Sequence, residues 1–137
     1  MLTVLERTPV IVSDTARPWS VFIKVDCGYH RAGRDAHGDA VVALCTAVAA
    51  SPSARFRGLY SHSGDSYNCA GHGVEEVRSG VAAVIESERS GIAGVAHRLR
   101  DAGCDVPTVS VGATPSISVS ATGDQWRGCT EVQRPVD

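Results

Sequence analysis

The sequence predicts an α/β fold in which a parallel sheet is covered by helices. Two observations support this class. Segments with strand and helix patterns alternate along the chain as strand, helix, strand, helix, strand, and the connections between strands are long enough to contain a helix. Closing an eight-stranded barrel takes about 250 residues, and this chain has 137. We therefore expect about three β/α units, either as a small open sheet or as part of a larger (β/α)8 barrel that is not closed.

Three segments have the composition of short buried strands. Residues 20–26 are rich in β-branched and aromatic side chains and end at a glycine-containing segment, as a buried strand does. Residues 55–62 form the second predicted strand and residues 108–113 the third. The tail from Ser116 alternates weakly, with Ile117 and Val119 two apart, and predicts one further strand.

Two segments have helical spacing. Residues 39–50 place five apolar side chains on one face, and Asp39 at the start complements the helix dipole. Residues 74–100 place apolar side chains at steps of three and four, with a bend expected near Gly91 and Gly94 and an end at Gly103. The polar face predicted for this second helix consists of Glu75, Glu76, Arg78, Glu86, Glu88 and Arg89.

The chain is interpreted as one incomplete domain over residues 1–137, with the informative part at 20–116 and a tail at 117–137. Its formal charge is −2 and its basic residues are dispersed, which argues against a nucleic-acid partner. No apolar run approaches the roughly 20 residues of a membrane span, and residues 1–14 lack the features of a signal peptide. Five cysteines without a Cys-x-x-Cys pair are typical of reduced thiols. We expect a cytoplasmic protein.

Polar, glycine-rich loops follow the carboxyl end of each predicted strand, where α/β folds bind ligands. In the first loop Arg31 suits a phenolate or a phosphate, although a solvated surface arginine would look the same. In the second, Tyr60, His62 and Tyr67 could stack on a flat ring. Alternatively, Tyr60 and His62 are alternate strand residues that face one core.

The third loop contains Gly112 and Thr114 and supplies backbone N–H groups and hydroxyls, as a phosphate-binding turn does. An ordinary turn would have a similar sequence. No Walker or dinucleotide fingerprint is present. The five histidines show no tight spacing with the cysteines, so no metal site is predicted within this chain. Together the three loops predict a single site with a ring-stacking group, a cation and a phosphate cup.

Three motifs in this order resemble a known family. They are FIKVDCGYHRAG at residues 22–33, GLYSHSGDSY at 58–67 and VSVGATPS at 109–116. The chain resembles the fold-type III pyridoxal-phosphate enzymes, whose fold is a (β/α)8 TIM barrel of the alanine racemase type. Within them it resembles the branch of D-serine dehydratase and D-threonine aldolase, and the second motif is closer to the dehydratases.

The resemblance implies a role for each matched residue. Arg31 would contact the phenolate oxygen of the pyridoxal ring, and His62 would lie against the ring face. Tyr60 and Tyr67 would line the pocket. The phosphate contacts implied by the resemblance are Gly112 and Thr114.

The implied activity is that of a lyase that converts D-serine, or a related 3-hydroxy D-amino acid, to a 2-oxo acid and ammonia. No catalytic residue is assigned within this chain, since the Schiff-base lysine of the family lies upstream and Lys24 does not match it. The complete enzyme would also use zinc, with ligands beyond this chain, and the family's barrels commonly pair as homodimers.

The chain is thus expected to be a fragment that is inactive alone and that leaves strand edges unpaired. Two alternatives stay open: a catalytically inactive module or remnant that binds pyridoxal phosphate, and D-threonine aldolase activity within the same family.

Overall fold

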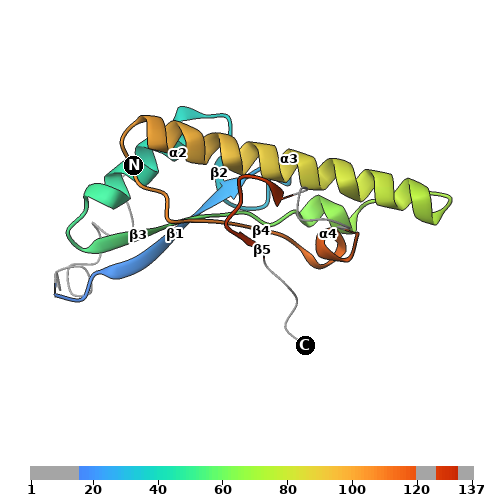
Figure 1. The fold of residues 1–137 in the computed structure, drawn as a ribbon, viewed down its shortest axis with the longest axis horizontal. Coiled ribbons are helices and arrows are strands. Elements are labelled where there is room, and N and C mark those ends of the chain that lie inside the picture. Colours follow the sequence, from blue (N-terminus) through green and yellow to red (C-terminus); the bar gives the residue numbers. More distant parts are fainter. Residues whose placement is uncertain (1–15, 120–125, 133–137) are drawn as a thin grey trace.

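A computed structural model describes residues 16–119 and 126–132 of the chain, which form one parallel sheet with helices against it (Figure 1). The spatial strand order is β2-β1-β3-β4-β5. The strands are β1 (Trp19–Asp26), β2 (Arg34–Asp35), β3 (Ala54–Tyr60), β4 (Thr108–Val111) and β5 (Glu131–Val132). The helices are α2 (Asp39–Ala50), the 3-10 turn η2 (Gly64–Tyr67), α3 (Val74–Asp101) and α4 (Thr114–Val119). Every strand pair is parallel.

The predicted fold class is confirmed. Three principal strands alternate with two principal helices, and the sheet is open over the described residues, as expected of part of a barrel. The three strands and two helices lie where the sequence predicts them, with ends that differ by at most two residues. None of the helices in the described ranges is both long and apolar enough to cross a membrane.

Helices α2 and α3 lie along one side of the sheet and bury its apolar side chains (Figure 1). Residues two apart along a strand point to the same face, so Ile23 and Val25 of β1 pack beneath these helices together with Leu59 and Val109. From α3 the core receives Ile92, Val95, Ala96 and Leu99. Arg98 of α3 donates hydrogen bonds to the carbonyls of Ala36 and Gly38, and so connects α3 to the segment just before α2.

Gly58 makes the central strand possible. The register of β1 against β3 shifts between Val21 and Phe22, where a bulge adds one residue to β3. Gly58 adopts φ +140°, and a Cβ there would clash with the Thr108 carbonyl oxygen. Any other residue would have to push β4 away.

The strand predicted from Ser116 onward is wrong, because residues 114–119 form α4. The Ile117 N–H donates to the Ala113 carbonyl and the Ser118 hydroxyl to the Thr114 carbonyl, both within one turn. Pro115 in the first turn favours this start, since its missing N–H would have no helical partner there. The rest of the predicted tail lies partly at 120–125 and 133–137, outside the described residues.

The edges of the three principal strands are partly paired, whereas the sequence predicted unpaired edges. β2 pairs with Val25 and Asp26 at the end of β1, and β5 pairs with Ser110 and Val111 of β4. Next to β5, Thr130 exchanges hydrogen bonds with the Val109 backbone and extends the pairing. These two-residue strands come from loops, where no periodicity could reveal them.

The bend expected in the second helix is also absent, since α3 continues through Gly91 and Gly94 (Figure 1). Gly91 instead permits close packing: a Cβ there would lie 3.1 Å from the Cys27 Sγ and 3.4 Å from the Ala36 Cβ.

Candidate functional site

The loops that follow β1, β3 and β4 meet at the carboxyl edge of the sheet, and His62 lies among them. Burial lowers the pKa of the His62 imidazole, and the positive charges of Arg31 and Lys24 lower it further, while a hydrogen bond to the Gly112 backbone opposes the shift. Arg31 from the first loop and Gly112 from the third therefore act on one ring from the second. His62 is neutral at pH 7, as a group that stacks on a flat ring should be.

Tyr67 extends this ring surface. The His62 and Tyr67 ring centroids lie 6.1 Å apart at an interplanar angle of 27°, a stacked arrangement. Tyr67 is 57% exposed, so its ring is open to a ligand. The pair presents a flat surface at the edge of η2 that a second ring could cover.

Asp26 at the end of β1 fixes the first loop. One carboxylate oxygen accepts hydrogen bonds from the Gly28 and His30 N–H groups at 3.0 Å each, and the other lies 3.2 Å from the His30 Nδ1. Burial opposes ionisation, but these hydrogen bonds outweigh it and lower the pKa of Asp26. His30 consequently holds a positive φ of 56°, which is rare for a side-chain-bearing residue. The next residue, Arg31, is thereby directed to the site, with its guanidinium carbon 5.3 Å from the Tyr29 ring centroid.

Lys24 is a member of this site that the sequence interpretation set aside. Its Nζ lies 5.3 Å from the Tyr60 ring centroid, a cation–π arrangement between neighbouring strands. Lys24 also lowers the pKa of His62. The alternation of the strand could have placed it, because Lys24 and Phe22 share the face opposite to Ile23 and Val25.

The third loop is tied to the second by serine side chains. Gly112 has φ +129°, a region that favours glycine, and is followed by the start of α4 at Thr114. The buried hydroxyls of Ser116 and Ser63 lie 2.7 Å apart, and the Ser66 hydroxyl donates to the Ser63 carbonyl at 2.6 Å. The segment predicted to hold a phosphate is therefore fixed relative to His62.

Glu88 lies directly behind these loops, and its predicted place on the polar face of the second helix is wrong. It is 2% exposed, and neither carboxylate oxygen has a hydrogen-bond partner of normal geometry among the described residues. Burial raises its pKa, although Ser63, Ser61 and the Gly112 backbone are near enough to oppose this. The signal was in the sequence: residue 88 continues the heptad-like series of buried positions Val81, Ile85, Ile92, Val95 and Leu99.

A cavity of about 90 Å³ lies beside Glu88 and His62. It is lined by Cys27, Gly28, Tyr29, Ser61, His62, Ser63, Asp65, Val84, Ser87 and Glu88. Burial raises the pKa of the Cys27 thiol to about 11, and the Glu88 carboxyl adds to the shift, so this thiol is not a nucleophile near neutral pH.

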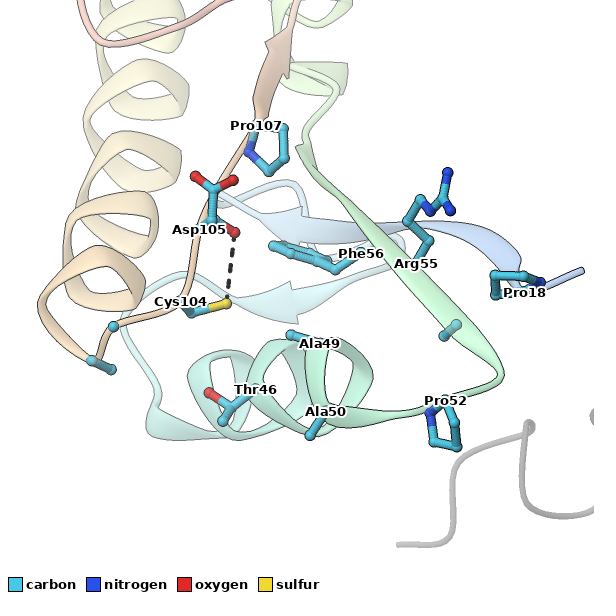
Figure 2. A pocket seen from close by; sticks show the side chains of 13 residues that line it. Pro18, Thr46, Ala49, Ala50, Pro52, Arg55, Phe56, Cys104, Asp105 and Pro107 are labelled. Carbon is cyan, nitrogen blue, oxygen red and sulfur yellow. Dashed lines mark hydrogen bonds between the residues drawn. The ribbon is translucent and has the colours of Figure 1, made fainter. Parts of the chain in front are cut away.

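A larger hollow of about 500 Å³ lies at the opposite edge, where β3 begins (Figure 2). Figure 2 shows mostly small or apolar side chains around it, together with Arg55 and Asp105, and the Cys104 thiol is hydrogen-bonded to the Asp105 carbonyl. Chemistry in parallel β/α folds belongs to the carboxyl edge, and the amino edge serves stability. We therefore assign the site to the loops around His62.

The structure brings Arg31, His62, Tyr67 and Gly112 together. Tyr60 is the last residue of β3, two positions before His62, and Thr114 begins α4 two positions after Gly112. These groups have the chemistry that a phosphorylated aromatic ring would need: an imidazole for stacking, a guanidinium for an anionic oxygen, and a glycine turn for a phosphate. Among the described residues, no group of three or more histidine, cysteine or carboxylate side chains could hold a metal ion.

The chain is similar to a known protein family, to two characterised enzymes and to a solved structure. The family described as "Alanine racemase, N-terminal domain" matches residues 3–132. The chain is 37% identical over 105 residues to D-serine dehydratase of Dictyostelium discoideum, a match that covers 74% of this chain and 25% of the relative. It is 30% identical over 118 residues to D-threo-3-hydroxyaspartate dehydratase of Delftia sp. strain HT23, covering 86% and 29%. The solved structure of that enzyme superposes with a TM-score of 0.76 at 27% identity, over 93% of this chain and 31% of that one. The chain thus spans between a quarter and a third of these relatives.

Proposed function

We propose, from the premise that this chain belongs to the alanine racemase N-terminal domain family, that it is part of a pyridoxal-phosphate-dependent dehydratase. The substrate would be D-serine or a related 3-hydroxy D-amino acid, and the products a 2-oxo acid and ammonia. The observation that carries the proposal is the juxtaposition of Arg31, His62 and Gly112 from three separate loops. The names of the two relatives, both dehydratases, support the substrate class.

When bound, pyridoxal phosphate supplies an electron-withdrawing ring that accepts the negative charge left when the α-proton of an amino acid is removed. The residues of this chain would bind and orient that ring. His62 would lie against its face as a neutral imidazole and Arg31 would donate to its phenolate oxygen. The Gly112 turn and Thr114 would hold the phosphate with backbone and hydroxyl donors.

Arg31 and Lys24 would also set the electrostatics of the ring. Both lower the pKa of His62, so two cations lie near this ring before any ligand enters. A dianionic phosphate and a phenolate are attracted to such a site, and His62 stays neutral between these two cations. Tyr67 would shield the open side of His62 from water.

The lysine and the zinc ligands of the complete enzyme would come from segments outside this chain. A binding module without catalysis is the second candidate function, and one observation favours it. Lys24, the sole lysine of the chain, lies against the Tyr60 ring and does not match the family's Schiff-base lysine.

Binding of the cofactor tests the first step of the proposal. Equilibrium dialysis of this chain against pyridoxal 5′-phosphate should show binding that Arg31→Ala and His62→Ala weaken at least fivefold, whereas Arg55→Ala at the opposite sheet edge should leave it unchanged. Borohydride reduction should leave no stoichiometric label in the chain. Equal binding by all four proteins, or none at millimolar cofactor, would contradict the assignment.

Activity is assayed on the complete protein encoded by the reading frame that contains these 137 residues. That protein should release a 2-oxo acid and ammonia from D-serine, D-threonine or D-threo-3-hydroxyaspartate. Release of glycine and an aldehyde from D-threonine would assign the aldolase reaction instead, and cofactor binding without turnover would assign the binding module.

A further inference from the structure

Glu88 is a costly group for a helix whose other inward positions are apolar. Its carboxyl group is 2% exposed and without a hydrogen bond of normal geometry in the described part of the chain. Removing a carboxyl group from water is unfavourable unless it is neutralised or paired. An apolar residue at this position of α3 would fill the space beneath β3 and β4 without that cost, so packing alone does not account for Glu88.

We propose that Glu88 is a positioning residue of the cofactor site, which holds the backbone around His62 and Gly112 from behind the sheet. The inference rests on the proposed function and deepens it. Glu88 would touch neither the cofactor nor the substrate, and would act through the two segments that do.

The neighbours of the carboxyl group support this role. Ser61 and Ser63, which precede and follow His62, both face Glu88 and lower its pKa, as hydroxyl donors do. The Gly112 backbone lowers it as well, and the same residue raises the pKa of His62. Donors lower a carboxyl pKa and acceptors raise an imidazole pKa. The Gly112 backbone thus lies near both groups, and His62, Ser61, Ser63 and Glu88 line the same 90 Å³ cavity.

A second connection reaches α4. The Ser63 hydroxyl that faces Glu88 lies 2.7 Å from the Ser116 hydroxyl in the buried layer between α3 and α4. Ser63 follows His62 directly, lines the same cavity as Glu88, and is joined by its hydroxyl to Ser116 of α4. A change at Glu88 should thus move the ring-stacking and phosphate-binding segments together.

The charges around Glu88 come from each element packed against it. Lys24 of β1 favours its ionised form, and the carboxyl group itself raises the pKa of Cys27 after β1 and of Cys129 before β5. Asp65 of η2 shares the 90 Å³ cavity. Both thiols have a pKa of about 11 and are uncharged near neutral pH, so burial is the influence that raises the pKa of Glu88, against the nearby donors and Lys24.

The ring signals of His62 in this chain, followed by NMR against pH without any cofactor, test the connection directly. His62→Gln identifies the signal. In the wild-type chain the His62 chemical shift should show a second inflection where Glu88 ionises, and Glu88→Gln should remove that inflection while it preserves the wild-type shifts. Glu75→Gln, on the exposed start of the same helix, is the matched control and should retain both inflections.

Cofactor affinity gives the second readout. Glu88→Leu, which fills the space without donors or acceptors, should weaken pyridoxal 5′-phosphate binding about tenfold, and Glu88→Gln should stay within twofold of wild type. Wild-type His62 titrating with one inflection, the same as in Glu88→Gln, would overturn the positioning role, as would unchanged affinity in Glu88→Leu. If the wild-type chain binds no cofactor, the proposed function fails for this chain, and the NMR titration alone still decides whether Glu88 controls His62.

Discussion

The two faces of the sheet differ in what their residues do. On the face beneath α2 and α3, Val25 and Leu59 are at most 1% exposed and join the apolar core. On the opposite face, Phe22 is 43% exposed, and Lys24 lies against Tyr60. Both sets come from the same strands, because successive side chains point to opposite sides. One strand therefore specifies the fold with one set of positions and the site with the other.

This division separates stability from chemistry. Burial of an apolar side chain contributes about 1.5 to 3 kcal/mol, so the covered face should dominate the free energy of unfolding. The open face contributes less to that free energy, but it has the charged and aromatic groups a ligand would meet. Glu88 is the exception, since it is a titratable group within the covered layer.

The largest expected effect is on the covered face. Leu59→Ala removes a fully buried side chain from the central strand and should lower the free energy of unfolding by about 2 to 5 kcal/mol. Phe22→Ala, one strand away on the open face, should lower it by less than about 1 kcal/mol. Urea unfolding followed by circular dichroism measures both. Equal losses would mean that the open face is covered in solution, for example by a second copy of the chain.

The next largest expected effect is that ionisation of Glu88 makes the free energy of unfolding depend on pH. Its folded-state pKa is raised above the unfolded value, so the folded protein retains a proton that the unfolded chain releases. Glu88 thus penalises folding progressively as pH rises above its unfolded pKa, and not below it. A tenfold difference in proton affinity between the folded and unfolded states corresponds to about 1.4 kcal/mol.

Glu88→Gln removes this titration. The difference in free energy of unfolding between the variant and wild type should grow as pH rises from about 4.5, the ordinary glutamate range, and favour the variant at pH 7. Glu86→Gln is the matched control: Glu86 is paired with Arg89, a contact that lowers the Glu86 pKa, so its removal should give the opposite trend. A pH-independent difference for Glu88→Gln would show that folding does not raise the pKa of Glu88.

The covered face is the part that the sequence could predict. The pattern of apolar residues depends directly on which side chains are buried. The principal elements and their order were therefore predictable from the helical spacing in residues 39–50 and 74–100 and the β-branched runs at 20–26 and 108–113. α4, β2 and β5 were not, because each contains six residues or fewer and is fixed by contacts with distant segments, such as Ser116 with Ser63. The local pattern of apolar and polar residues does not indicate such long-range contacts.

The residue types of the candidate site could be proposed from the sequence, but their arrangement in space could not. The three loop motifs named Arg31, His62 and Gly112, but only the register of β1, β3 and β4 brings them together. Lys24 was considered only as a candidate Schiff-base lysine, so its electrostatic effect on the pKa of His62 was not predicted. Glu88 was assigned by its charge, although its spacing from Ile85 and Ile92 marked it as buried.

The smallest expected effect concerns the charges on the open face. Burial and then Arg31 lower the pKa of His62, so Arg31→Gln should raise that pKa toward the ordinary histidine value without reaching it, because burial remains. The same NMR titration of the His62 ring measures the change. Arg31 is exposed and in the first loop, so the free energy of unfolding should stay within about 0.5 kcal/mol of wild type.

A matched charge removal makes this prediction specific to the loop. Arg55→Gln removes the same charge at the start of β3, on the hollow at the opposite edge of the sheet, and should leave the pKa of His62 unchanged. Raised salt should shrink the Arg31 effect, since exposed charges are screened over about 8 to 10 Å, but should not remove the part that burial causes. If Arg31→Gln and Arg55→Gln shift the pKa of His62 equally, the effect is one of net charge, and the first loop does not bring its arginine to the ring in solution.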